Sequence, residues 1–150
     1  MDRISFIGIG NVGRGDDGVA HHVLDLLEAS LSPGEREHVG LLRVHQLDFG
    51  MAADIAETEL VVFVDAERRT EPAVRVDRLS PGPGAASLHG VDATGLLGLA
   101  KSLYAATPEA WLVSVAAPEM EHAEGLSETA ETASFEAASA IRTMLDERAV

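Results

Sequence analysis

The chain opens with an apolar run, a glycine-rich turn and an amphipathic segment in immediate succession. Residues 4–9 (ISFIGI) form a short apolar run that is typical of a buried strand. Apolar residues then recur at helical spacing across residues 18–31, which predicts a helix. The glycines therefore lie at a helix N-terminus, where unpaired N–H groups and a partial positive charge are available. This order favours a fold assembled from strand-to-helix units.

Strand-like and helical segments continue to alternate along the rest of the chain. Strands are expected at 39–47, 60–64, 73–79 and 111–115, and helices at 51–56, 91–104 and 128–148. The continuous apolar run at 60–64 is typical of a central parallel strand, whereas the alternation at 73–79 predicts a strand near an edge. We therefore expect an α/β fold in one domain, residues 1–150, with three layers. It would be a mostly parallel twisted sheet of about five strands with helices on both faces.

Composition excludes several classes of protein. The net charge of −14 leaves no basic face for a nucleic acid or an anionic membrane. No apolar stretch approaches the roughly 20 residues of a membrane-spanning helix, and the N-terminus lacks a basic signal-peptide region. The chain has no cysteine, which excludes disulfides, thiol nucleophiles and thiolate metal sites. We expect a cytoplasmic protein, and a monomer, because the final helix can pack on its own sheet.

The glycine-rich turn has two interpretations. Gly8, Gly10 and Gly13 satisfy the G-x-G-x-x-G spacing of dinucleotide-binding proteins, although a single match is weak evidence. Asp16 and Asp17 follow at the same helix mouth, where two carboxylates would repel a phosphate. One of them, more plausibly Asp16, is expected to cap the helix, and the other is then available for a cation or a polar substrate. A Rossmann-like dinucleotide-binding enzyme remains the weaker alternative.

Polar residues follow three of the expected strands. Asp17 comes after the first strand, Asp65 directly after the run at 60–64, and His89 after the expected edge strand. The carboxyl ends of parallel strands form a crevice where the strand order reverses, so an order 2-1-3 would bring Asp17 and Asp65 face to face. Two carboxylates and an imidazole leave coordination positions open and suit zinc, nickel, cobalt or cadmium. Each residue also has an explanation without function: an aspartate can cap a turn or a helix, and His89 can be a loop histidine.

The ordered motifs resemble the hydrogenase maturation endopeptidases. They are Gly8-Ile9-Gly10-Asn11, Asp16-Asp17-Gly18-Val19, Val64-Asp65-Ala66, Ser87-Leu88-His89, Val113-Ser114-Val115-Ala116-Ala117-Pro118-Glu119 and Gly125-Leu126-Ser127. The resemblance spans nearly the whole chain, and the ordered set is far more specific than any single motif.

This resemblance implies a fold, an activity and a partner. Members of the family have a twisted sheet between helices, and they remove a short C-terminal extension from the large-subunit precursor of nickel–iron hydrogenases after nickel insertion. It implies that Asp17, Asp65 and His89 are the metal-binding and catalytic residues, with Asp16 secondary. The expected metal is nickel supplied by the substrate, or another divalent ion such as zinc.

The chain also departs from the family pattern. Gly13 replaces a residue that is often bulky and apolar, and Ala20 replaces a glycine. The family's Asp-Gly-Gly-Thr segment appears as Asp48-Phe49-Gly50-Met51, and that segment is thought to help recognise the substrate. We therefore predict that Asn11, Asp48 and Gly50 contact the substrate. A non-catalytic metal-binding accessory protein with the same three ligands remains an alternative.

Overall fold

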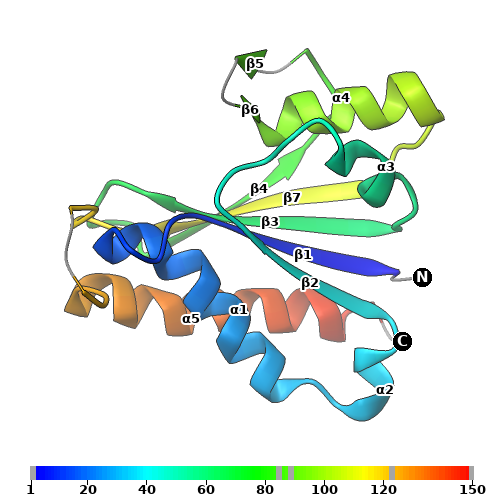
Figure 1. Ribbon diagram of the computed structural model, residues 1–150. Helices are drawn as coiled ribbons and strands as arrows, with labels where there is room; N and C mark the ends of the chain where they lie inside the picture. Colours follow the sequence, from blue (N-terminus) through cyan, green and yellow to red (C-terminus); the bar gives the residue numbers. More distant parts are fainter. Residues whose placement is uncertain (1–2, 84–85, 88–89, 122–123, 149–150) are drawn as a thin grey trace.

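A five-stranded sheet in the order β2-β1-β3-β7-β4 forms the middle of the molecule (Figure 1). The computed structural model describes residues 3–83, 86–87, 90–121 and 124–148. The strands are β1 (Ile4–Ile9), β2 (Val39–Val44), β3 (Leu60–Glu67), β4 (Val74–Leu79) and β7 (Glu109–Ala116). All neighbouring pairs are parallel except β4 with β7, which is antiparallel. The predicted mostly parallel α/β sheet is confirmed, and so is the edge position of the strand at 73–79.

Helices cover both faces of the sheet (Figure 1). One face carries α1 (Val19–Ser30), α2 (Pro33–Arg36) and α5 (Glu128–Asp146), and the other carries α3 (Met51–Ala56) and α4 (Ala93–Tyr104). Three features differ from the sequence expectation: a 3₁₀ turn, η1 (Gly15–Gly18), precedes α1, the short helix α2 follows α1, and the short strands β5 (Ala86–Ser87) and β6 (Gly90–Val91) pair before α4. No helix in the described part of the chain is long and apolar enough to cross a membrane.

The period-two geometry of the strands explains why the central run is apolar throughout. On β3, Leu60, Val62 and Val64 pack into the core beneath α1 and α5. The alternate residues Val61 and Phe63 pack into the second core, beneath α3 and α4. A strand covered on both faces has no solvated side, so every position selects an apolar residue.

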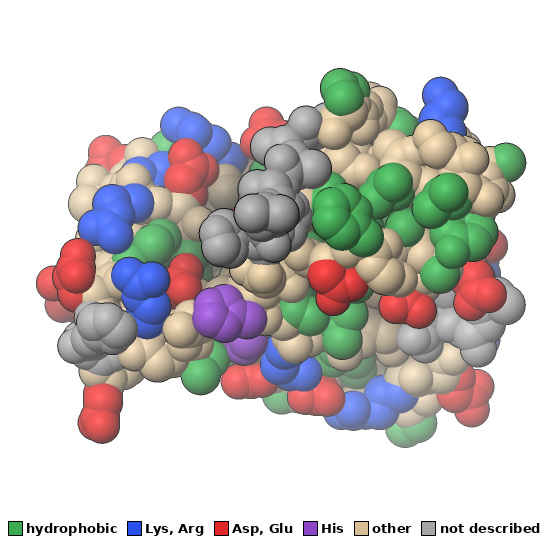
Figure 2. Space-filling model, turned by 45° about the horizontal axis from the view of Figure 1, so that its top comes forward, with side chains coloured by type: hydrophobic (Ala, Val, Ile, Leu, Met, Phe, Trp, Pro, Cys, Tyr) green, Lys and Arg blue, Asp and Glu red, His purple; other side chains and the backbone are tan. Residues whose placement is uncertain are grey.

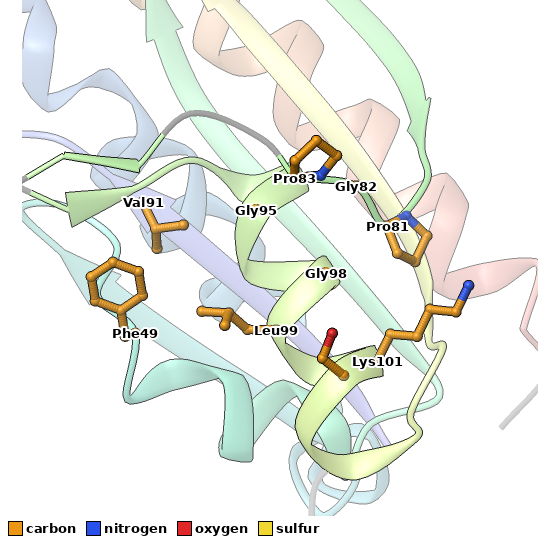
Figure 3. Close-up of a pocket in the computed structure, with 10 residues that line it drawn as sticks. Phe49, Pro81, Gly82, Pro83, Val91, Gly95, Gly98, Leu99 and Lys101 are labelled. Carbon is orange, nitrogen blue, oxygen red and sulfur yellow. The ribbon is translucent and has the colours of Figure 1, made fainter.

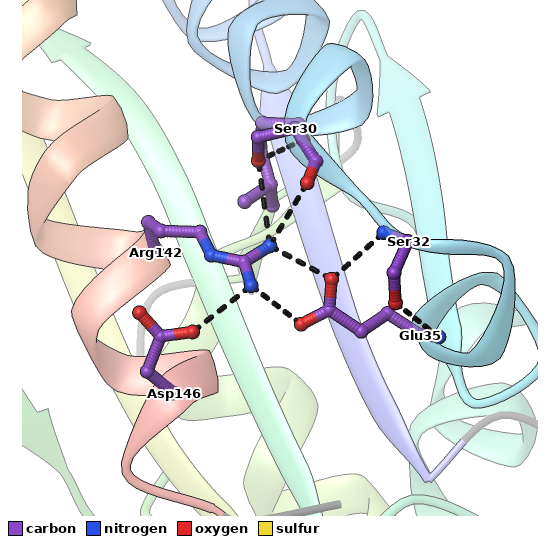
Figure 4. A network of polar contacts seen from close by, with 6 residues as sticks. Ser30, Ser32, Glu35, Arg142 and Asp146 are labelled. Atoms are coloured by element: carbon purple, nitrogen blue, oxygen red, sulfur yellow. Dashed lines mark hydrogen bonds and ion pairs between the residues drawn. The ribbon is translucent and has the colours of Figure 1, made fainter.

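A polar network joins the end of α5 to the short helix α2 (Figure 4). The Arg142 guanidinium donates to both carboxylate oxygens of Glu35, at 2.9 and 2.6 Å, and lies 2.9 Å from Asp146. Glu35 also accepts a hydrogen bond from the Ser32 N–H and completes a capping box on α2. The Arg142 hydrogen bond lowers the pKa of Glu35, and the network orients two helices that are far apart in sequence.

Candidate functional site

The site lies at the carboxyl ends of β1 and β3, where the strand order reverses. β1 pairs with β2 on one side and with β3 on the other, which confirms the expected order 2-1-3. In this register Ile9, the last residue of β1, is the partner of Asp65 on β3. Open parallel sheets bind ligands at such a point, because the two crossovers leave in opposite directions and leave a crevice between them.

The glycine-rich turn brings Asp17 back onto the end of β1. Gly10 has a φ of +151°, and a Cβ added there would lie 1.9 Å from the Asp17 carbonyl oxygen. Only glycine permits this approach. The backbone of Asp17 therefore fills the space that a bound pyrophosphate would need beside the second glycine of a dinucleotide fingerprint. This geometry gives no support to the Rossmann-like alternative.

The Asp17 carboxylate is half-buried and held by the same turn. Its Oδ2 accepts a hydrogen bond of 3.0 Å from the backbone N–H of Asn11. The Asn11 side chain in turn accepts a bond of 2.8 Å from the Gly13 N–H. The turn thus holds the Asp17 carboxylate near the end of β1. The Asn11 side-chain oxygen stabilises the turn by accepting the hydrogen bond from Gly13.

Asp65 lies on β3 at the same end of the sheet, and its pKa is raised above the ordinary value. The pKa of Asp65 is raised from 3.8 to about 6. Burial is the largest cause, a hydrogen bond from the Ala66 backbone lowers the pKa, and the negative charges of Asp17 and Glu67 contribute to raising it. A bound cation would offset the repulsion between the Asp17 and Asp65 charges.

Asp16 has a different role from the one predicted. Its side chain is fully buried, and its two carboxylate oxygens accept hydrogen bonds from the N–H of Glu119 at 2.8 Å and from the N–H and hydroxyl of Ser127, both at 2.7 Å. Neither η1 nor α1 has a side-chain cap, so the expectation that Asp16 caps its own helix is wrong. We call Asp16, Glu119 and Ser127 the Asp16 cluster; it joins the glycine-rich turn to the start of α5.

The structure gives less information about the other predicted site residues, His89, Asp48 and Gly50. His89 lies outside the described residues, so its part in the site stays a prediction. Asp48 is exposed just before α3, and Gly50 occupies the N-cap position of that helix. Within the described part of the chain, no group of three or more histidine, aspartate or glutamate side chains could hold a metal ion. The described site is therefore the Asp17–Asp65 pair, and its third ligand remains predicted.

One residue beside the site was not anticipated from the sequence. Arg69 follows β3 and has only 10% of its side chain exposed. Its guanidinium donates to the backbone carbonyls of Pro72 at 2.8 Å and Ser114 at 3.0 Å, and it pairs with Glu67. Ser114 is the β7 partner of Asp65, so Arg69 anchors the strand next to the site. An arginine after a strand carries no local signal of this role.

Comparison with known proteins gives matches in structure only. No protein-family model matches the chain, and no curated protein matches it. Among solved structures, a hydrogenase 2 maturation peptidase from a Thaumarchaeota archaeon aligns with a TM-score of 0.70 and 24% identity over 97% of this chain and 99% of that one. The hydrogenase maturating endopeptidase HybD from E. coli aligns at 0.69 and 21% identity, over 98% and 94%. The NiFe hydrogenase maturation protease HycI from Thermococcus kodakarensis aligns at 0.72 and 23% identity, over 96% and 92%.

These alignments cover nearly all of each chain, so the likeness concerns the whole fold and not a shared substructure. The chain therefore has the fold of the hydrogenase maturation peptidases.

Proposed function

We propose that this protein is an endopeptidase that removes the C-terminal extension of a nickel–iron hydrogenase large-subunit precursor after nickel insertion. The observation that carries the proposal is the position of Asp65 at the switch point of the sheet, with a raised pKa to which the charge of Asp17 contributes. Its support comes from the ordered motifs and from a fold that maturation peptidases share. A fold alone does not specify an activity, so the chemistry has to come from these two carboxylates.

The donor set fits a divalent transition metal. Asp17 and Asp65 would supply carboxylate oxygens, and His89 an imidazole nitrogen, a combination suited to nickel or zinc. We favour nickel carried by the substrate, which would dock on these residues and position the scissile bond in the crevice. A resident divalent ion such as zinc would instead polarise the scissile carbonyl and activate water.

When it does not coordinate the metal, Asp65 is the carboxylate best matched to accept a proton from the attacking water. A pKa of about 6 lies close to neutral pH, where a general base combines basicity with a large ionised fraction. Asp17 is held by the Asn11 N–H and adds the charge that keeps the Asp65 pKa high. Asp16 is unsuited to proton transfer, because three hydrogen bonds and complete burial leave its oxygens no access to water.

The test is intact-mass spectrometry of a hydrogenase large-subunit precursor after incubation with the protein, with and without inserted nickel. Loss of a C-terminal peptide from the nickel-loaded form alone is the expected result. Cleavage of both forms would support a metal carried by the peptidase itself. If neither form is cleaved while the protein still binds nickel or zinc, the accessory-protein alternative replaces the peptidase.

A further inference from the structure

A pocket of about 640 Å³ lies on the α4 side of the sheet, separate from the Asp17–Asp65 pair (Figure 3). Its lining includes Phe49 from the loop before α3, Pro81 and Pro83 from the loop after β4, and Leu99 and Lys101 from α4. Figure 3 shows Phe49 near one end and Lys101 with Pro81 near the other. The three segments are distant in sequence and meet only in the folded chain.

Glycines on α4 build this pocket. A Cβ on Gly98 would lie 2.2 Å from the Gly82 carbonyl oxygen, and a Cβ on Gly95 would lie 2.8 Å from the Val91 side chain. The loop backbone therefore rests directly on the helix. Two prolines restrict the backbone on either side of Gly82, so this wall of the pocket is stiff. A preformed wall lowers the entropy cost of binding.

The chemistry of the lining is apolar with a single cation. Lys101 is the only lysine of the chain and, in its described part, the only charged residue that lines the pocket. Among the described residues, no carboxylate forms an ion pair with it. An ammonium group without an ion pair at the end of an apolar pocket is complementary to an apolar ligand that ends in a carboxylate.

Phe49 connects this pocket to the segment that the sequence suggested for substrate recognition. Its side chain is 52% exposed, although it is large and apolar. Figure 2 shows hydrophobic side chains gathered on this face of the molecule. From Ala93 to Lys101 the helix advances about 12 Å at the helical rise, which matches about four residues of an extended peptide.

We infer that this pocket binds the C-terminal end of the peptide that the proposed peptidase removes. The inference rests on the proposed function for the identity of the ligand. Apolar side chains of the peptide pack against Phe49, Val91 and Leu99, and its terminal carboxylate lies at Lys101. The peptide is thus held on both sides of the scissile bond, at the metal site and at its own free end.

The direct test uses a fluorescein-labelled peptide, Gly-Ser-Gly-Ala-Val-Leu-Ala-Val, with either a free C-terminal carboxylate or a C-terminal amide. Fluorescence anisotropy should show weaker binding of the amide by about 1.5-fold to fivefold, the range expected for one partly exposed ion pair. In ¹H–¹⁵N spectra, the free acid should shift the amide signals of Phe49, Gly98 and Lys101. Equal affinity for both peptides, or no binding, would overturn the inference.

Variants separate the two ends of the pocket. Lys101→Glu should remove the preference for the free acid, and Phe49→Ala should weaken both peptides equally. Arg36→Glu is the matched control, because Arg36 is an exposed cation on α2, on the opposite face of the sheet. If Arg36→Glu reduced the preference as strongly as Lys101→Glu, the effect would be one of net charge and the pocket would have no part in it.

A processing assay keeps this inference separate from the proposed function. With the precursor as substrate, Lys101→Glu should raise KM and leave kcat unchanged, because it removes binding far from the reacting bond. A wild-type protein that binds the free acid but cleaves no precursor would contradict the proposed function and retain a peptide-carboxylate site. Normal cleavage with an unchanged KM in Lys101→Glu would contradict the inference and leave the peptidase intact.

Discussion

Asp16 and Asp17 are adjacent in the same turn, yet the structure places their carboxylates in opposite environments. Asp16 is fully buried and accepts three hydrogen bonds from Glu119 and Ser127. Asp17 is half-buried, accepts one bond from a backbone N–H, and faces a second carboxylate, Asp65. Hydrogen bonds within the Asp16 cluster stabilise the negative charge of Asp16. The negative charges of Asp17 and Asp65, in contrast, repel each other.

Under the proposed function, the difference separates a structural carboxylate, Asp16, from a functional one, Asp17. A buried charge that is fully hydrogen-bonded stabilises the fold and has no capacity left for a ligand. Two carboxylates that repel each other cost stability, and such arrangements are concentrated at functional sites. Four predictions test this contrast, from the largest expected effect to the smallest.

The first prediction concerns the pair. Asp17→Asn, Asp65→Asn and His89→Ala should each reduce precursor processing by about 10²-fold or more, because each removes a ligand or a proton acceptor. Processing would be followed by intact mass, with circular dichroism as the check on folding. His22→Ala is the control, since His22 packs edge-on against Phe135 away from the predicted ligands. A variant that processes at the wild-type rate would exclude its residue from the site.

The second prediction concerns the cluster. Asp16→Ala should lower the free energy of unfolding by about 3–5 kcal/mol, because three hydrogen-bond donors lose their buried acceptor. Urea denaturation would measure the loss. The matched control is Asp25→Ala, since Asp25 pairs with Arg43 at an exposed position and should cost about 0.5 kcal/mol or less. Equal losses in the two variants would show that the Asp16 cluster contributes nothing beyond a surface ion pair.

The third prediction uses pH. The folded-state pKa of Asp65 is about 6, above its ordinary value of 3.8, so folding favours the protonated form and wild-type stability falls as pH rises from about 4 through 6. Asp65→Asn lacks this loss. It should be more stable than wild type by about 1–3 kcal/mol above pH 7 and equal to it near pH 4. A stability difference that does not change with pH would contradict the raised pKa.

The fourth prediction isolates one hydrogen bond of the cluster. Ser127 caps α5 by accepting from the Ala130 N–H and also donates its hydroxyl to Asp16. Ser127→Ala should cost about 1–2 kcal/mol, against about 1 kcal/mol for Ser32→Ala, which removes the N-cap of α2. Thermal denaturation of both variants gives the difference. A smaller loss in Ser127→Ala than in Ser32→Ala would mean that the hydroxyl adds nothing to the Asp16 carboxylate.

Much of the fold was predictable because its signals are local. The apolar run at 60–64 and the helical spacing at 18–31 depend on neighbouring residues, so both elements appear close to their expected positions. The ends were less accurate: β3 continues to Glu67, and β2 stops at Val44. Strand ends depend on backbone pairing with neighbouring strands, and that pairing leaves no periodic trace in the sequence.

The site was predictable only in part. The sequence placed Asp17 and Asp65 after their strands and made their meeting conditional on a 2-1-3 order; the structure has that order, and the joint role of the two aspartates stays a prediction. The pocket at Phe49 and Lys101 was not predicted, because it joins segments from three separate loops and helices. The sequence alone does not indicate which residues surround the single lysine, Lys101, so it predicts no binding role for it.

The sequence by itself determined the order of the elements, the apolar faces of the strands and helices, and the residue types at the strand ends. These follow from side-chain periodicity and turn chemistry, which act over a few residues. The tertiary structure decided which of two adjacent aspartates is buried, because the partners of Asp16 lie 103 and 111 residues along the chain. Whether a carboxylate is hydrogen-bonded or lies near another negative charge depends on contacts between residues far apart in the sequence. Only the folded chain brings such residues together.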